Sequence, residues 1–251
     1  MDSPLIFPDW PVPSNVRACS TTRCGGVSPP SYHSLNVAGH VGDAQACVSE
    51  NHQLLMKYAQ LPAMPAWLKQ VHGTRVLRLT GEQSINVDTD NVDTEADAIY
   101  SNLPGQVCAV MTADCLPVLF CSRYGDEVAA AHAGWRGLAA GVLERTLTEF
   151  SASPADIFAW LGPAIGPQKF EVDEDVKQAF TATDAVYSSA FRPSGRQYLA
   201  DIYLLARLRL QIAGIDKLYG GTCCTLSDSR RFFSYRRDGI TGRMASLIWL
   251  V

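Results

Sequence analysis

The stretch QVCAVMTADCLPVLFC, residues 106–121, decides the fold class of this chain. Apolar and β-branched side chains fill it except at Ala113 and Asp114, so the pattern predicts two buried strands around a sharp turn. Residues 127–131, EVAAA, form another short apolar run that ends directly before His132. Because these neighbouring strands are too close in sequence for a helical crossover, mixed or antiparallel pairing is expected.

Beyond this region the hydrophobic period becomes helical. Apolar residues recur at helical spacing over residues 136–150, which predicts an amphipathic helix that covers the strands. A second long helix is expected over residues 199–213, ended by Gly214. Residues 157–161 and 245–251 are expected to be further strands. The interleaved pattern predicts an α+β fold with mixed or antiparallel β-sheets covered by helices.

Length and composition are those of one globular domain. The chain has 251 residues, of which 47% are hydrophobic and 18% are charged, and such a chain can bury a sizeable core. Residues 83–94 are polar and are expected to form an exposed loop, with residues 181–198 as a second excursion. Neither stretch resembles an interdomain linker. We therefore expect a single catalytic domain over residues 1–251.

Charge and hydropathy exclude several classes of function. The net charge of −4 differs from the basic footprint of proteins that work on nucleic acid, so no nucleic-acid partner is expected. No apolar run reaches the roughly 18 residues that span a bilayer. Residues 1–13, MDSPLIFPDWPVP, do not have the basic start of a signal peptide. We expect a cytoplasmic protein with no membrane partner, and no sequence feature specifies an oligomeric state.

The eight cysteines do not follow the pattern of a disulfide framework. They are sparse, none lies in a CxxC pair, and Cys223 and Cys224 are adjacent, where a disulfide would be strained. Four others lie among apolar or small residues and are expected to be buried thiols: Cys19, Cys47, Cys108 and Cys121.

Three residues are candidate metal ligands: His72, Cys115 and His132. Each is expected at the end of a strand, where a rigid scaffold can present a functional group. Two imidazoles and one thiolate suit zinc, and three protein ligands leave the fourth tetrahedral position open. The same set could hold copper. The spacing alone is nonspecific and is more often that of satisfied core residues, so on the residues alone both interpretations stay open.

Several strings of the sequence resemble the laccase-domain, or YfiH-like, family. The resemblance runs from residue 20 to the C-terminus and covers nearly the whole chain. Its motifs are STTRCGGV (residues 20–27), SLNV (34–37), KQVHG (69–73), ADCLPV (113–118), HAGWRG (132–137), LGPAIG (161–166) and FFSYRRDG (232–239).

The resemblance implies an enzyme. Members of the family are described as purine nucleoside phosphorylases and, earlier, as multicopper polyphenol oxidases. The family's zinc ligands, which are also the implied catalytic residues, fall on His72, Cys115 and His132. The implied reaction is phosphorolysis of adenosine, inosine and 5′-methylthioadenosine to the free base and a ribose 1-phosphate, accompanied by adenosine deamination. Purine nucleoside and phosphate would be the partners and zinc the cofactor, with copper possible at the same site.

Arginine is expected to bind the phosphate, because one guanidinium donates to two oxygens at once. Arg23 and Arg136 are the first candidates, since nearby glycines permit close approach of the backbone to a ligand. Asn36 is a lesser candidate for holding a sugar hydroxyl. An alternative anion site would use Arg236 and Arg237.

The remaining motif residues have more ordinary expected roles. Asp114 either orients a ligating imidazole or makes the turn before Cys115. Residues 162–166, GPAIG, are expected to form a pocket wall. The other three histidines, His33, His40 and His52, are expected to be structural or surface residues.

Three rival functions remain open. A copper-dependent phenol oxidase would use the same ligands, although a four-copper oxidase needs more imidazoles than the five histidines of this chain. A metal-free cysteine hydrolase would use Cys115 as nucleophile and His132 as base, which leaves His72 without a role. A catalytically idle binding protein is the third rival, and an open three-ligand site argues against it.

Overall fold

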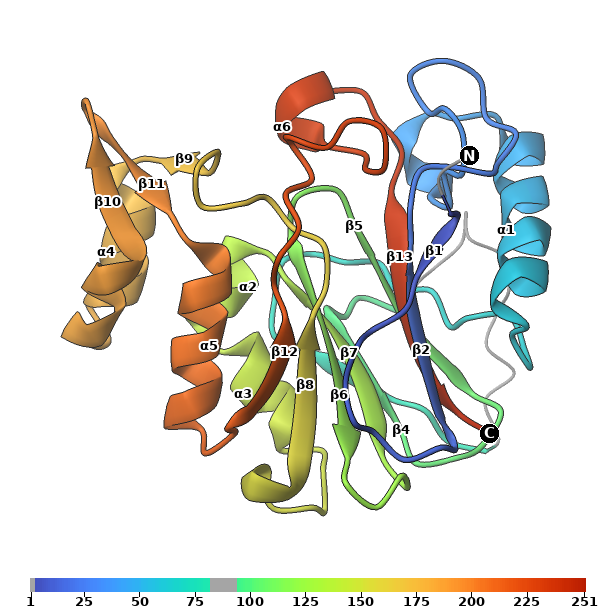
Figure 1. Cartoon of the computed structure of the whole chain (residues 1–251), viewed down its shortest axis with the longest axis horizontal. Helices are drawn as coiled ribbons and strands as arrows, with labels where there is room; N and C mark the ends of the chain where they lie inside the picture. The colour runs from blue at the N-terminus through green and yellow to red at the C-terminus, as the bar shows by residue number, and fades with distance from the viewer. Residues whose placement is uncertain (1–2, 82–93) are drawn as a thin grey trace.

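The computed structural model describes residues 3–81 and 94–251, and it contains three β-sheets (Figure 1). The largest has six strands in the order β12 (Lys217–Gly220), β8 (Ile157–Leu161), β6 (Leu116–Ser122), β7 (Val128–Ala133), β4 (Ala98–Ser101) and β3 (Val76–Arg78). The second has four strands in the order β1 (Leu5–Ile6), β2 (Val16–Thr21), β13 (Met244–Leu250) and β5 (Val107–Thr112). Antiparallel pairs and the parallel pairs β12–β8 and β3–β4 confirm the expected mixed α+β fold.

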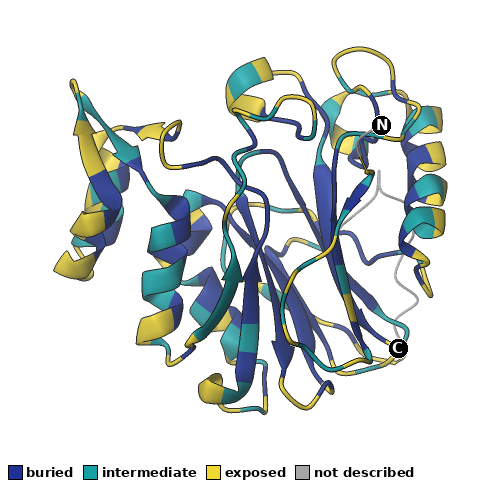
Figure 2. Ribbon diagram, viewed as in Figure 1, coloured by how far each residue is buried: buried dark blue, intermediate teal, exposed yellow. Residues whose placement is uncertain are grey.

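The two larger sheets pack face to face, with helices on their outer faces (Figure 1). On strand β6, Leu119 and Cys121 face the four-stranded sheet, while Val118 and Phe120 face the helices. Both faces of the strand are therefore buried, as the dark core of Figure 2 shows. This explains why its sequence is continuously apolar rather than alternating.

Strands β5 and β6 were expected to flank a turn at Ala113 and Asp114, and they do. The two strands nevertheless belong to different sheets, because β5 pairs with β13 whereas β6 pairs with β7 and β8. Asp114 has a φ of 90°, a left-handed conformation that aspartate tolerates better than most residues. Cys115 therefore lies on the crossover between the sheets.

The prediction of one continuous helix over residues 136–150 is wrong. The structure has two short helices, α2 (Trp135–Ala140) and α3 (Val142–Leu147), separated by Gly141 with a φ of 96°. A residue in this conformation ends an α-helix, and glycine adopts it at little cost. The helix predicted over 199–213 is confirmed as α5 (Ile202–Ile212), whose first turn is capped by Asp201 and which is followed by Gly214.

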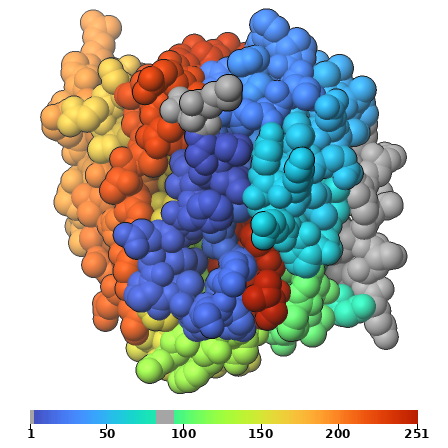
Figure 3. Space-filling view, turned by 45° about the vertical axis from the view of Figure 1, so that its right-hand side comes forward, coloured from blue at the N-terminus to red at the C-terminus, as the bar shows by residue number. Residues whose placement is uncertain are grey.

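The four-stranded sheet is covered by a helix that the sequence analysis did not identify. Helix α1 (Gln45–Ala59) packs Leu55 and Ala59 against this sheet. In the space-filling view, the dark blue N-terminal segment lies between the orange-red C-terminal third and the light blue to cyan region of α1 and the segment after it (Figure 3).

The excursion expected over residues 181–198 is instead ordered structure. It contains the 3-10 helix η3 (Ala185–Ala190) and the strands β10 (Phe191–Ser194) and β11 (Gln197–Ala200). These strands join β9 (Glu171–Val172) in a three-stranded sheet beside α4 (Glu174–Thr181). Aromatic contacts stabilise this unit, with the Phe180 ring 6.0 Å from Phe191 and 6.1 Å from Tyr187. Of the polar loop predicted over 83–94, residues 83–93 lie outside the described part of the chain.

All eight cysteines are free thiols. Cys19, Cys108 and Cys121 are buried as predicted, and burial raises the pKa of Cys19 to about 12. The prediction for Cys47 is wrong: it lies in the first turn of α1 and is only half-buried, whereas the next residue, Val48, is fully buried. Among the described residues, none of the helices has the length and apolar character needed to cross a membrane.

Candidate metal centre

Three segments bring the candidate ligands to one end of the facing sheets. Cys115 lies on the crossover from β5 to β6, and His132 is the next-to-last residue of β7, paired with Pro117 of β6. His72 lies in the loop between Lys69 and β3, with a φ of 60°. The ligand atoms of the three side chains all lie within 4.8 Å of one another. The structure thus brings together three residues that are 43 and 17 positions apart in the sequence.

The three side chains differ in exposure. His132 is buried, Cys115 is half-buried and His72 is exposed. The imidazole rings of the two histidines meet edge to face, with their centroids 4.8 Å apart. This triad of His72, Cys115 and His132 therefore has one side fixed in the protein interior and another side open to solvent.

Gly134 closes one side of the triad with bare backbone. A β-carbon at this position would lie 2.6 Å from Nδ1 of His72 and 3.1 Å from Sγ of Cys115. Its φ of −61° is ordinary, so glycine is required here by space and not by backbone conformation. The HAGWRG motif therefore supplies both a candidate ligand and the room that the other two candidates occupy.

A buried carboxylate, that of Asp97, binds the imidazole of His132 and the backbone of the loop that carries His72. Its Oδ1 accepts hydrogen bonds from Nδ1 of His132 at 2.8 Å and from the backbone N–H of His72 at 2.9 Å. Its Oδ2 accepts from the backbone N–H of Gly73 at 2.6 Å and of Val71 at 3.2 Å. Because Nδ1 of His132 is engaged by the carboxylate, Nε2 is the nitrogen left for a ligand.

Asp97 was not among the site residues predicted from the sequence. The only available signal was an aspartate placed directly before the apolar residues of β4. A charged residue is almost never fully buried unless it is paired, so its position at the start of a buried strand indicated a partner without identifying it.

The electrostatics of the triad favour positive charge beside Asp97. Burial lowers the pKa of His132, but the facing Cys115 and the hydrogen bond to Asp97 outweigh it and raise that pKa to about 9. Burial raises the pKa of Asp97, but its hydrogen bonds to His132 and Gly73 reverse the effect and lower it. Burial and the neighbouring His132 lower the pKa of His72. A proton or a metal ion would satisfy the same preference.

Gln70 anchors the loop that carries His72. Its Nε2 donates to the carbonyl of Met111 at 2.8 Å, and its Oε1 accepts from the backbone N–H of Met111 at 2.7 Å. The side chain thus continues the backbone pairing of β5 and fixes the KQVHG motif against the end of that strand.

We expect Asp97→Asn to weaken metal binding about 10- to 100-fold, the usual effect of losing a partner that orients a ligating imidazole. The amide keeps the size of the carboxylate but places an N–H₂ group opposite donors. A chelator-competition titration measures the change in affinity. The control is Asp43→Asn, because Asp43 also accepts several hydrogen bonds, from Ser28, Asn36 and Ala44, away from the triad. Both variants should lose about 1–3 kcal/mol of unfolding free energy, and unchanged metal affinity in Asp97→Asn would contradict the role given to it.

A cavity of about 750 Å³ lies over the triad. Such a volume is in the range of small-molecule sites, roughly 300–1,000 Å³. Besides the three candidate ligands, its walls include His40, Leu68, Gln70, Met111, Ala113, Tyr235 and Arg243. Of these, His40 is exposed, as expected for a surface residue, and Tyr235 and Arg243 were not among the expected site residues. Tyr235 and Arg243 come from the C-terminal segment and His40 from near the N-terminus, so only the tertiary fold brings them together.

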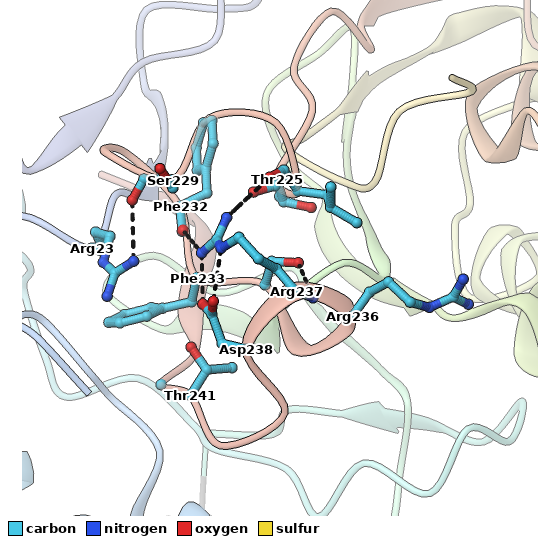
Figure 4. A network of polar contacts seen from close by, with 12 residues as sticks. Arg23, Thr225, Ser229, Phe232, Phe233, Arg236, Arg237, Asp238 and Thr241 are labelled. Atoms are coloured by element: carbon cyan, nitrogen blue, oxygen red, sulfur yellow. Dashed lines mark hydrogen bonds and ion pairs between the residues drawn. The ribbon is translucent and has the colours of Figure 1, made fainter. Parts of the chain in front are cut away.

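Arg23 and Asn36 use their polar groups within the protein. Arg23 donates from Nε to the carbonyl of His33 at 2.7 Å and from Nη1 to that of Ser229 at 3.1 Å, and it lies over the Phe233 ring (Figure 4). The fully buried Asn36 donates to Asp43 and accepts from the backbone N–H of Arg243. Neither residue is among those that line the cavity.

The other three arginines proposed from the sequence also differ in their surroundings. Arg136 is exposed at the start of α2, with its guanidinium 4.3 Å from the Trp135 ring, and it contributes to lowering the pKa of His72. Arg237 donates to Thr225, Leu226, Phe232 and Asp238, so all five of its N–H groups have partners. Arg236 points away from that network and donates to the carbonyl of Glu171 (Figure 4).

Asp114 makes the turn before Cys115 and binds the C-terminal segment, rather than an imidazole. It accepts from the hydroxyls of Thr225 and Ser234 and from the backbone N–H of Arg236. This last contact lies at the start of α6 (Tyr235–Asp238).

Residues 162–166 and His52 lie away from the cavity over the triad. Of residues 162–166, Gly162 and Pro163 line a different cavity, of about 320 Å³, and not the one over the triad. His52 is structural as expected: it is buried, bonded to the carbonyl of Val37 and stacked on Trp67.

The chain is similar to known proteins over nearly its whole length. Residues 17–251 match the family described as multi-copper polyphenol oxidoreductase laccase. A purine nucleoside phosphorylase of Escherichia coli, YfiH, is 58% identical over 99% of this chain and 100% of its own length. A purine nucleoside phosphorylase of Pseudomonas aeruginosa is 51% identical, with 98% of each chain covered. A crystal structure of a Neisseria meningitidis protein superposes with a TM-score of 0.90 at 47% identity, covering 98% of this chain and 99% of that one.

Proposed function

This chain belongs to the multi-copper polyphenol oxidoreductase laccase family, and we propose that it is a zinc-dependent purine nucleoside phosphorylase. The observation that carries the proposal is the convergence of His72, Cys115 and His132 beside a cavity. The high identity to relatives named purine nucleoside phosphorylase supports the reaction type.

The residues of the triad fit a zinc ion. Two imidazoles and a thiolate are donors that zinc prefers, and a three-ligand set leaves one tetrahedral position for water or substrate. Sγ of Cys115, Nε2 of His132 and a ring nitrogen of His72 would hold the ion, with Asp97 and Gly134 keeping the donors in position. When bound, the ion supplies a Lewis acid that polarises a substrate oxygen or lowers the pKa of water. Copper would suit the same donors.

The cavity is suited to a nucleoside beside a phosphate. Leu68, Met111 and Ala113 give it an apolar wall, and Tyr235, which is 60% exposed, presents an aromatic ring that can pack on a purine. In the proposed reaction a phosphate oxygen forms a bond to C1′ of the ribose as the C1′–N9 bond breaks. The base leaves with a proton, and ribose 1-phosphate is the other product. An apolar wall also suits the methylthio group of 5′-methylthioadenosine, alongside adenosine and inosine.

Adenosine deamination is the second activity in the proposal. Water replaces the amino group at C6 of adenine, which yields inosine and ammonia. The same three side chains and the same cavity would serve this reaction. We also propose a cytoplasmic location, because eight free thiols persist best in a reducing compartment.

Of the substrate residues proposed from the sequence, Arg136 is exposed, stacks on Trp135 and lies near enough to His72 to lower its pKa. It would contact an anionic substrate from the solvent side. Arg23 and Asn36 would contribute by holding the segments behind the cavity, since their polar groups are bonded within the protein.

Metal analysis and an inosine assay test the proposal together. The purified protein should hold about one zinc per chain and should release hypoxanthine from inosine only when phosphate is present. A chelator should stop the reaction, and added zinc should restore it. Copper-dependent phenol oxidation without any cleavage of inosine would favour the oxidase instead.

A further inference from the structure

Arg243, which directly precedes β13, is the arginine that lines the cavity over the triad. Its guanidinium is held by Nη1, which donates to the carbonyls of Thr241 at 3.0 Å and Gly242 at 3.2 Å. Its backbone N–H donates to Oδ1 of Asn36 at 2.9 Å. Within the part of the chain that the structure describes, neither Nε nor Nη2 of Arg243 has a hydrogen-bond acceptor. The side chain is therefore positioned by Nη1, and Nε and Nη2 can donate to a ligand.

Two cationic side chains line the cavity, Arg243 and Lys69, and Lys69 pairs with Glu95 at 2.9 Å. Arg243 and His40 both line it, and burial together with the charge of Arg243 lowers the pKa of His40. The carboxylate that acts most strongly on Arg243 is that of Asp114, and both oxygens of Asp114 already accept hydrogen bonds from other groups. No aspartate or glutamate is among the described residues that line the cavity. Such a wall favours an anion, because Arg243 carries a positive charge and the neutral imidazole of His40 can still donate one N–H to an oxygen.

The other arginines are less suited to this task. The donors of Arg237 are all engaged by the protein, and Arg23 donates to two carbonyls outside the cavity wall. Arg136 stacks on Trp135 and is exposed. Only Arg243 combines a half-buried position, a place on the cavity wall and unused donors within the described residues.

We propose that Arg243, with His40 beside it, forms the subsite for inorganic phosphate in this cavity. The inference rests on the proposed phosphorolysis and adds the residues that hold the nucleophile. Nε and Nη2 of Arg243 would donate to two phosphate oxygens, the geometry for which a guanidinium is suited. The bound phosphate would then lie in the same cavity as the ribose that it attacks, so that a bimolecular step becomes one between neighbours.

The test is Arg243→Gln in the zinc-loaded protein, with two measurements. One is the affinity for inorganic phosphate by calorimetry, and the other is the KM for phosphate in inosine cleavage. We expect both to weaken about 10- to 100-fold, because two charge-assisted hydrogen bonds are lost, while zinc content and the KM for inosine stay within about twofold. Arg243→Lys, which keeps the charge without the fork, and His40→Asn should each show a smaller loss, and they serve if Arg243→Gln folds poorly.

The control is Arg192→Gln, which removes the same charge from an exposed position on β10, in the separate three-stranded sheet. It should leave phosphate binding unchanged. If the wild type binds phosphate and Arg243→Gln binds it equally well, the subsite assignment is wrong and the proposed function stands. A loss in Arg136→Gln alone would move the subsite to Arg136.

Two further outcomes would overturn the inference. If the wild type binds no phosphate, both the subsite and the phosphorolysis fall. If inosine 5′-monophosphate loses affinity in Arg243→Gln while inorganic phosphate does not, the arginine recognises the phosphate of a nucleotide. The assignment to a free co-substrate would then be wrong.

Discussion

Cys115→Ala is expected to abolish tight zinc binding and, with it, nucleoside cleavage. The thiolate is the only sulfur ligand in the candidate set, and the two remaining imidazoles would hold zinc poorly. The loss of affinity should exceed the roughly 10- to 100-fold that follows from losing a partner behind a ligand. Metal analysis after dialysis and the release of hypoxanthine from inosine measure the two effects.

The matched control for this variant is Cys47→Ala. Cys47 is also a half-buried free thiol, but it lies on α1, on the outer side of the four-stranded sheet. This variant should keep about one zinc per chain and full activity, which separates the effect of the ligand from that of losing any thiol. A Cys115→Ala protein that retains zinc at full stoichiometry would show that the assignment of the ligands is wrong.

The parts of the fold that were predicted correctly are those in which one local pattern dominates. Residues 107–112 and 116–122 are strands buried on both faces, so their apolar character does not depend on knowing their neighbours. Helix α5 has a helical apolar pattern, a capping aspartate and a glycine after its end. The pairing of strands β5 and β6 with different sheets could not be predicted, because the partner of β5 is β13, far away in the sequence.

The errors arose where a single residue or a tertiary contact overrides the pattern. Gly141 divides one amphipathic pattern into two helices, since the pattern reports which face is buried and not whether the backbone is continuous. Residues 181–198 are mostly polar, yet Tyr187 and Phe191 pack on Phe180 of α4 and join the core on the helical side of the six-stranded sheet.

The candidate ligands could be proposed from the sequence because each lies in a distinctive motif. The residues that surround them could not. Asp97, His40 and Arg243 are ordinary charged or titratable residues in sequence. Only the fold shows that Asp97 is buried between the imidazole of His132 and the backbone of His72, and that the other two line one cavity. Arg23 is the opposite case: the neighbouring glycines indicated an anion-binding residue, but its guanidinium donates to carbonyls within the protein.

His72→Ala is the variant that separates metal chemistry from thiol chemistry. In the zinc proposal His72 is a ligand, so its loss should be about as harmful as that of Cys115, with both zinc and nucleoside cleavage lost. In a cysteine hydrolase only Cys115 and His132 would form the reactive pair. The exposed position of His72, opposite the buried His132, makes this substitution the less disruptive way to remove one imidazole.

The control is His33→Ala, because His33 is also exposed and does not line the cavity. It should keep its zinc and its activity. Treating the wild type with a chelator and then with a thiol-alkylating reagent completes the comparison. In the zinc proposal the chelated enzyme is inactive before alkylation, and added zinc restores it unless Cys115 has been modified. In the thiol mechanism the chelated enzyme stays active until Cys115 is alkylated. Full nucleoside cleavage by the metal-free protein, or by His72→Ala, would therefore show that the metal-centre assignment is wrong. Cys115 and His132 would then be a nucleophile and its base.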